Sequence, residues 1–189
     1  MILLIETNYK RKEIYEIREA LLKESIPCAV GRAEETELYM AASLILTADR
    51  VAVGEVRSIA EMYRLKAEVA FCETDTLFAF AKERYLSIEN EALARIRGIS
   101  EKDRFLSVGG KEIYLTKTEM RIARGLITAP RDTWLTPDKL SSYCLKEPSK
   151  NENTVSVHIS NINKRCERVN RQALILCRRF SGYKLNEDI

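Results

Sequence analysis

The chain has 189 residues, a length that accommodates one domain or two small ones. Hydrophobic residues make up 46% of it and charged residues 31%, which excludes disordered, collagen-like and low-complexity classes. The formal net charge of +3 divides into −3 over residues 1–100 and +6 over residues 101–189. The second half is therefore the candidate for an anionic partner such as nucleic acid.

The apolar runs, cysteines and histidine exclude several further classes. No apolar run approaches the ~20 residues of a membrane span, and Met1–Ile5 is too short for a signal peptide. Five scattered cysteines without a C-x-x-C pair argue against a disulfide framework, so a cytoplasmic location is expected. Only one histidine exists, His158, and we expect neither a metal site nor a cofactor.

The first hundred residues alternate between strand-like and helix-like segments. The strand-like segments are Ile2–Ile5, Pro27–Val30, Arg50–Gly54, Glu68–Cys72 and Arg84–Ile88. The helix-like segments are Tyr9–Lys23, Glu34–Leu46, Ser58–Leu65, Thr76–Lys82 and Asn90–Ile99. This alternation predicts an α/β domain whose parallel sheet carries helices on both faces, as in flavodoxin-like folds.

The pattern changes after residue 98. Gly109-Gly110 predicts a hairpin between Arg104–Val108 and Lys111–Leu115. Three helices are expected next: one capped by Thr116 with Glu119, one that starts at Thr136-Pro137 and ends near Tyr143, and Asn153–Val169. Ala173–Arg178 and Tyr183–Leu185 close the chain as a second hairpin. Hairpin, three helices, hairpin is the element order of a winged helix-turn-helix.

The third of these helices has two distinct faces. Its apolar stripe is Val155, Ile159, Ile162, Cys166 and Val169. The opposite face consists of Asn153, Val157, Ser160, Asn161, Lys164 and Arg168, with no acid among them. Cations suit phosphates, asparagine suits the adenine edge, and Val157 suits a thymine methyl group. The alternative is that this is only the solvated face of an amphipathic helix.

His158 and the closing hairpin flank that face. His158 lies at its edge, where a half-buried structural histidine that also reaches a phosphate is favoured over a ligand or base. Arg178-Arg179 precede the turn Phe180-Ser181-Gly182. A basic hairpin tip is what a minor-groove wing needs, although two arginines are also ordinary solvated surface.

Three blocks together resemble the effector domain of OmpR/PhoB-type response regulators. They are Leu115–Glu119 (LT-x-x-E), Thr154–Ile159 (VDVHI in the family) and Arg179–Leu185 (RG-x-GY-[RK]-[LF]). The resemblance spans about residues 104–187 and implies a recognition helix in the major groove and a wing arginine, Arg179, in the minor groove. The predicted DNA-binding set is Asn153, Thr154, Val157, His158, Ser160, Asn161, Asn163, Lys164, Arg168, Arg178 and Arg179.

This chain departs from the family pattern at several positions, and the resemblance also implies RNA polymerase as a possible second partner. The family usually has arginines where this chain has Asn153, Ser160, Asn161 and Asn163, so fewer phosphate contacts and an A·T-leaning site are expected. The segment Ser141–Glu152 stands where the family has its transactivation loop, which touches RNA polymerase in some members.

Residues 1–98 resemble a receiver domain at their two edges, Ile2–Asn8 and Tyr85–Leu86 followed by Ala94–Arg97. Receiver chemistry needs a phosphoryl-accepting aspartate beside carboxylates that hold Mg²⁺. Glu6 keeps one carboxylate, but Thr7 replaces the other.

The expected third strand ends at Gly54-Glu55, with Asp49 placed before it rather than after it. We therefore predict no phosphorylation by the usual route. Glu55 is either an ordinary surface acid or a mimic of phosphoaspartate.

These observations predict residues 1–98 as a degenerate receiver-like domain, 99–103 as a linker and 104–189 as a winged-helix DNA-binding domain. The expected function is a phosphorylation-independent transcriptional regulator that binds double-stranded DNA as a homodimer. Glu91 and Arg95 on the last receiver helix either contribute to the dimer or pair only with each other.

Two other classes remain as alternatives. One is a protein-interaction module with weak, non-specific DNA binding, favoured by the arginine-poor helix face. The other is an enzyme or redox sensor, which is disfavoured because Cys28, Cys72 and Cys166 lie in apolar stretches and no nucleophile–base pair is visible. The chain is expected not to be an enzyme.

Overall fold

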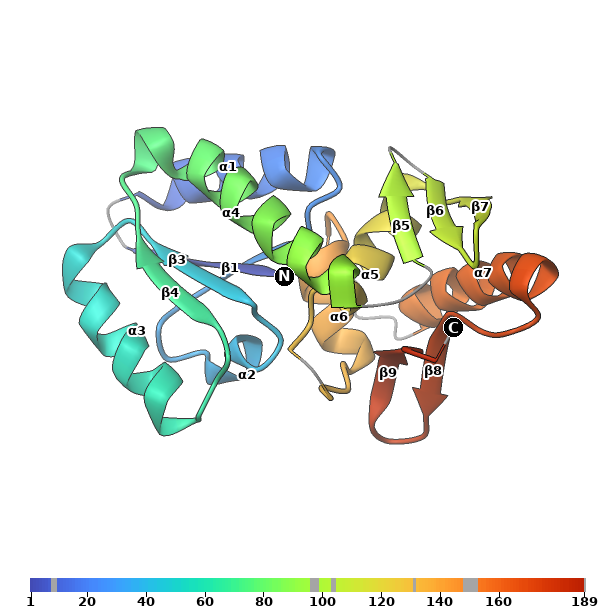
Figure 1. Cartoon of the computed structure of the whole chain (residues 1–189). Coiled ribbons are helices and arrows are strands. Elements are labelled where there is room, and N and C mark those ends of the chain that lie inside the picture. The colour runs from blue at the N-terminus through green and yellow to red at the C-terminus, as the bar shows by residue number, and fades with distance from the viewer. Residues whose placement is uncertain (8–9, 96–98, 103–104, 131, 148–152, 189) are drawn as a thin grey trace.

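The computed structural model describes residues 1–7, 10–95, 99–102, 105–130, 132–147 and 153–188 (Figure 1). A four-stranded parallel sheet forms the centre of the first half. Its strands are β1 (Ile2–Ile5), β2 (Cys28–Gly31), β3 (Leu44–Thr47) and β4 (Glu68–Phe71), in the order β2-β1-β3-β4. The register pairs Leu3 with Ala29 on one side and with Ile45 on the other.

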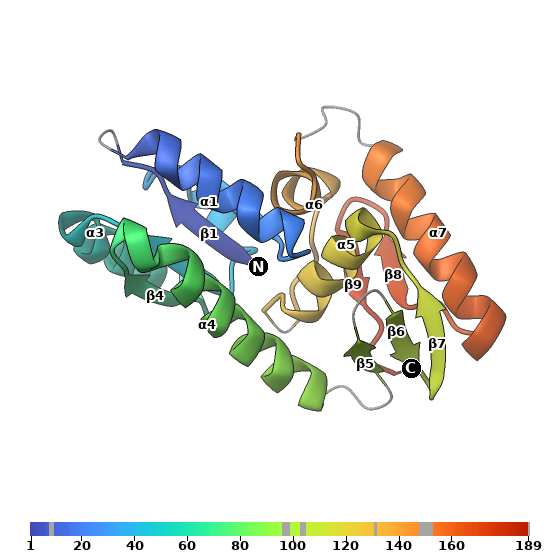
Figure 2. The ribbon, with the colours of Figure 1, turned by 90° about the horizontal axis from the view of Figure 1, so that it is seen from above.

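Helices cover both faces of this sheet, as the sequence predicts (Figures 1 and 2). The helices α1 (Arg11–Lys23) and α4 (Thr74–Arg95) lie on the face that presents Ile2 and Leu4. The short helix α2 (Thr36–Tyr39) and α3 (Arg50–Met62) lie on the opposite face, which presents Leu3 and Ile5. Both faces of the strands are therefore buried, which explains why β1 and β3 are continuous apolar runs.

Two predicted elements of the first half were wrong. The expected helix Glu34–Leu46 is only the short α2, and the third strand is Leu44–Thr47 instead of Arg50–Gly54. Asp49 causes the difference, because its carboxylate accepts the N–H of Val51 at 2.8 Å and caps α3. Residues 50–54 are therefore helical, and Val51 is 86% exposed.

The predicted fifth strand was also wrong, and the expected linker contains a strand. Arg84–Ile88 lies inside the 22-residue helix α4, which continues to Arg95. Within the expected linker 99–103, Ile99–Lys102 forms strand β5, which pairs antiparallel with β6 (Phe105–Val108). Residue 103 lies outside the described residues.

The second half follows the predicted order of hairpin, three helices and hairpin. The elements are β6, β7 (Lys111–Tyr114), α5 (Lys117–Ile127), α6 (Pro137–Cys144), α7 (Asn153–Asn170), β8 (Ile175–Arg178) and β9 (Gly182–Leu185). Gly109 and Gly110 turn the first hairpin with φ of 57° and 76°, and Thr116 with Glu119 forms the expected capping box on α5.

The two halves share one hydrophobic core. Leu3 and Ile45 of the parallel sheet belong to the same buried cluster as Leu126 of α5, Tyr143 of α6 and Ile162 of α7. The Tyr143 hydroxyl crosses the joint and donates to the Leu38 carbonyl oxygen at 2.7 Å. The halves are therefore packed against each other by apolar contact as well as connected through α4.

Candidate nucleic-acid interface

Helix α7 has the two faces that its sequence predicts. Its stripe is buried at Val155, Ile159, Ile162 and Cys166 and half-buried at Val169. The exposed residues of the opposite face are Asn153, Val157, Ser160, Lys164 and Arg168. Val157 keeps 56% of its surface exposed, so its methyl groups are accessible to a partner.

The remaining predicted residues of α7 border this face. Thr154, His158 and Asn161 are half-buried. Glu167 is exposed beside Lys164 and Arg168, so an acid does lie on the flank of the face. The face therefore combines two exposed cations with hydroxyl, amide and methyl groups.

An ion pair between a half-buried arginine and a buried glutamate fixes the orientation of α7. Arg165 of α7 donates to the Glu119 carboxylate, and the same carboxylate oxygen accepts the Thr116 N–H at 2.8 Å. Burial by itself raises the pKa of Glu119, but the hydrogen bonds from Arg165 and Thr116 outweigh it and lower that pKa. The carboxylate that caps α5 thus also holds α7 against it.

Asn163 has a different role from the predicted one. Its amide nitrogen donates to the Ile175 carbonyl oxygen at 2.8 Å, and its amide oxygen accepts the Ile175 N–H at 2.9 Å. Both polar groups of the side chain are therefore occupied by strand β8. Asn163 ties α7 to the closing hairpin, and its expected DNA contact is corrected to a structural role.

The hairpin β8–β9 projects from the body of the second half next to α7 (Figure 1). Strand β9 is fixed close to the turn, because Leu135 and Tyr183 exchange two backbone hydrogen bonds of 2.8 Å and Tyr183 pairs with Cys177, next to the last pair before the turn. Gly182 is required there, since a Cβ at this position would lie 2.1 Å from the Leu135 carbonyl oxygen. Arg178 and Arg179, predicted at the tip, are exposed.

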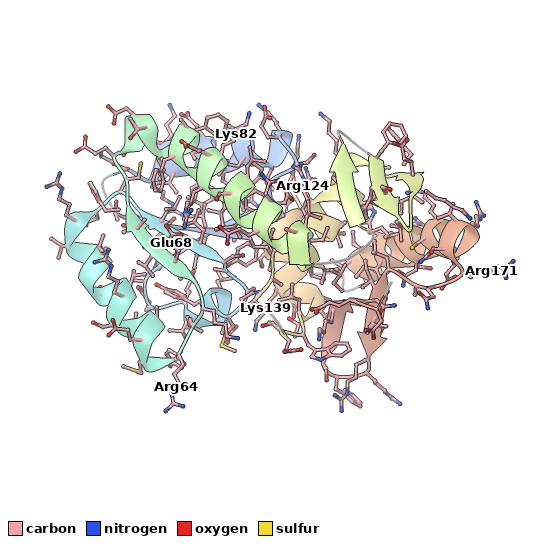
Figure 3. All side chains as sticks on the ribbon, in the orientation of Figure 1. Arg64, Glu68, Lys82, Arg124, Lys139 and Arg171 are labelled. Atoms are coloured by element: carbon pink, nitrogen blue, oxygen red, sulfur yellow. The ribbon has the colours of Figure 1, made fainter. Side chains whose placement is uncertain are left out.

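Helix α7 lies at the end of the molecule away from the parallel sheet (Figures 1 and 2). It packs against α5, α6 and the strands β6, β7 and β8. Arg171, just beyond α7, marks this far end in Figure 3. The outer face of α7 and the hairpin tip are thus both exposed on the same half of the molecule.

Arginines join the two halves elsewhere. Arg18 of α1 is buried and donates to the Leu145 and Lys146 carbonyl oxygens, at 2.8 and 3.0 Å, at the end of α6. Arg121 of α5 donates to the Leu22 carbonyl oxygen at 2.9 Å, at the end of α1. Arg124, labelled in Figure 3 at the joint, donates to the Glu24 carbonyl oxygen at 3.0 Å. Each arginine meets the negative end of a helix from the other half.

The segment predicted to meet RNA polymerase, Ser141–Glu152, is only partly a loop. Ser141–Cys144 is the last turn of α6, and Ser141, Cys144 and Leu145 are buried. These residues are corrected to core positions. Lys146 and Glu147 are exposed, and residues 148–152 lie outside the described residues.

The carboxyl edge of the parallel sheet contains a cavity of about 440 Å³ lined by Thr7, Lys10, Ala48, Asp49, Arg50, Phe71 and Glu73. Asp49 follows β3 instead of preceding its strand, which corrects the sequence-based prediction. Its carboxylate, however, caps α3. Glu6 is engaged by Arg11 at 3.4 Å and Arg32 at 3.3 Å.

Gly54 and Glu55 were predicted at this edge, and that prediction was wrong. Both are exposed residues in the middle of α3. The alternation of Arg50–Gly54 resembled a strand, but Asp49 starts a helix that carries Gly54 and Glu55 away from the carboxyl end of the sheet. Glu55 therefore does not stand where a phosphoaspartate mimic would.

The residues predicted for a dimer lie on the last turns of α4. Glu91 is exposed there, and the side chain of Arg95 is outside the described residues. The structure leaves the choice between a dimer contact and a pair within the helix open.

Four of the five cysteines are buried: Cys28, Cys72, Cys144 and Cys166. Burial raises the pKa of Cys28 and Cys144 to about 12 and that of Cys166 to about 11, which disfavours their thiolates. Within the described ranges, no three His, Cys, Asp or Glu side chains gather as metal ligands would. Among the same residues, no helix has the length and apolarity needed to cross a bilayer.

Neither the protein-family models nor the curated proteins contain a match to this chain. Among solved structures, it is similar to a streptococcal protein described as one of a novel family of redox sensors that evolved from two-component response regulators. The identity is 18%, the coverage is 98% of each chain and the TM-score is 0.44.

Two mutant forms of RitR match at 16% identity, with 98% of each chain covered and TM-scores of 0.41 and 0.43. All three identities lie below 25% and all three TM-scores below 0.5. What these proteins sense or bind therefore does not transfer to this chain.

Proposed function

We propose that this chain is a DNA-binding transcriptional regulator of the OmpR/PhoB-type response-regulator class, with a degenerate receiver-like first half. Residues 104–189 form its winged helix, α7 enters the major groove and the β8–β9 hairpin is the wing. The observation that carries the proposal is the outer face of α7, where Asn153, Val157 and Lys164 are exposed while the opposite stripe is buried.

The arrangement of the two halves supports this function. The joint uses α1, α4, α5 and α6 and leaves the outer face of α7 exposed. A regulator built in this way has its reading surface accessible without a rearrangement of the halves. Two copies bound to repeated half-sites raise the affinity through effective concentration, so we propose a homodimer.

We further propose that the regulator acts without aspartate phosphorylation. Asp49 follows β3, but it accepts a hydrogen bond at the start of α3. Glu6 is paired with Arg11 and Arg32. Mg²⁺ binds through carboxylate oxygens, and the two arginines compete with it for those of Glu6. Acetyl phosphate with Mg²⁺ should therefore add no phosphoryl mass and leave DNA affinity unchanged. An added phosphoryl group that disappears in Asp49→Asn would overturn this part.

Selection of bound duplexes from a random library, with full-length protein and no phosphodonor, tests the main proposal. We expect enrichment of two spaced half-sites. Asn161→Ala and Arg179→Ala should each weaken binding to the selected duplex, whereas Arg57→Ala, exposed on α3, is the matched control that leaves it unchanged. Binding that is weak and equal for all duplexes would instead favour a protein-interaction module, to which the arginine-poor face of α7 is also suited.

A further inference from the structure

The tip of the β8–β9 hairpin carries a residue that the fold does not need. Phe180 is 92% exposed, the most exposed large hydrophobic residue described. Its backbone has φ of 65°, in the left-handed region that glycine adopts without strain and a bulky side chain does not. Because the ring is exposed, burial of apolar surface does not offset this conformational cost.

Phenylalanine is also a departure from the family pattern at this position. In R-G-x-G-Y, the first glycine corresponds to Phe180 and the second to Gly182. Gly182 is retained because its close approach to Leu135 leaves no room for a Cβ. At Phe180 the chain instead places an aromatic ring where glycine would fit the backbone better.

The ring is paired with a cation. The Arg179 guanidinium lies 4.9 Å from the centroid of the Phe180 ring, within cation–π distance. Strand β9 is held by the Leu135–Tyr183 hydrogen bonds and by Lys184, whose ammonium is 2.8 Å from the Asp132 carboxylate. A fixed arm therefore presents one apolar ring and one positive charge together.

We propose that Phe180 is a wedge that enters between base pairs from the minor groove and bends the DNA, with Arg179 placed against the neighbouring phosphates. Proteins that kink DNA from the minor groove insert apolar side chains between base steps and hold the backbone with cations. This inference rests on the proposed DNA-binding function, and it adds a bend and a preference for easily unstacked pyrimidine–purine steps at the wing position.

The test compares Phe180→Gly and Phe180→Leu with the unchanged protein on the selected duplex. End-to-end fluorescence energy transfer in the DNA measures the bend, anisotropy measures affinity, and 2-aminopurine at the wing position reports unstacking. Phe180→Gly should abolish the bend and the unstacking and weaken binding about tenfold. Phe180→Leu should retain part of both.

Thermal unfolding separates this role from a structural one. Glycine relieves the left-handed strain, so Phe180→Gly should melt no lower than the unchanged protein while it loses the bend. Val51→Ser, which alters another exposed apolar residue far from the hairpin, is the control and should bend DNA normally.

The outcomes distinguish the two proposals. If the unchanged protein binds its selected duplex and Phe180→Gly binds and bends it equally, the wedge is overturned while the regulator stands. If the unchanged protein selects no duplex, the proposed function fails and the wedge fails with it.

Discussion

The joint between the halves and the outer face of α7 use cationic side chains in opposite ways. At the joint, Arg18 and Arg121 are buried and donate to carbonyl oxygens that end helices of the other half. On α7, Lys164 and Arg168 are exposed. The charge of +6 over residues 101–189 therefore overstates what DNA can meet, because part of it is used inside the protein. Position, rather than the count of charges, separates a structural cation from a binding one.

Removal of a joint arginine should have the largest effect. Arg121→Ala removes the buried donor to the Cys144 carbonyl oxygen and leaves the Leu22 carbonyl oxygen with only the Ser25 N–H. The free energy of unfolding should fall by about 3 kcal/mol in denaturant titration. Arg57→Ala, exposed on α3, should change it by less than about 0.5 kcal/mol. Equal effects of the two substitutions would remove the distinction between joint and surface.

Loss of the ion pair between Glu119 and Arg165 should have the second-largest effect on stability, and that effect should depend on pH. Glu119→Gln should lower the free energy of unfolding by about 2 kcal/mol at pH 7. Because the folded-state pKa of Glu119 lies below 4.5, the stability it confers is complete above that pH. It is lost as the pH falls through the lower folded-state pKa. Unfolding titrations from pH 7 to 3 should show the two proteins converging at the acidic end, and a constant difference would contradict this role.

At the border of the outer face of α7, Asn161→Ala should weaken specific DNA binding without a change in stability. Loss of a bidentate contact to adenine costs about 1–3 kcal/mol and relaxes the preference at one base position. Repeating the duplex selection with the variant measures that preference. A uniform loss over all sequences would indicate a phosphate contact instead.

The smallest expected effect belongs to Lys164→Ala. Loss of one phosphate contact should reduce the slope of log affinity against log salt by about 0.9 while leaving the selected sequence unchanged. Binding measured at several salt concentrations gives the slope. If the slope is unaffected, Lys164 is a solvated cation and the reading surface is smaller than proposed.

The sequence by itself determined most of the second half. The glycine pair at 109–110, the capping box at Thr116 and the stripe from Val155 to Cys166 are local signals, and each element formed where its signal lies. In the first half, the continuous run Ile2–Ile5 was sufficient, because a strand buried on both faces is apolar throughout. Glu68–Phe71 also formed a strand where one was expected, although it lies at the edge of the sheet and is half-buried.

The sequence pattern gave the wrong element where the same residues fit either a helix or a strand. Leu44–Thr47 fits either the end of a helix or a buried strand, and only its pairing with β1 and β4 selects the strand. Arg50–Gly54 alternates like a strand, yet the Asp49 cap makes it helical. That shift moved Gly54 and Glu55 away from the sheet edge and brought Asp49 to it.

Tertiary structure alone decided the roles of particular side chains. From the sequence, Asn163 was predicted to contact DNA, but in the fold its side chain is hydrogen-bonded to β8. Nothing in the sequence pattern indicated that Arg18 and Arg121 join the two halves. The sequence shows only that Phe180 stands where the family pattern has glycine. Its left-handed backbone and its exposure, which only the structure shows, are the basis for proposing a role in DNA binding. Periodicity reports which face of an element is buried. Which polar group meets which partner depends on how segments far apart in the chain pack together, and a local sequence pattern contains no information about that packing.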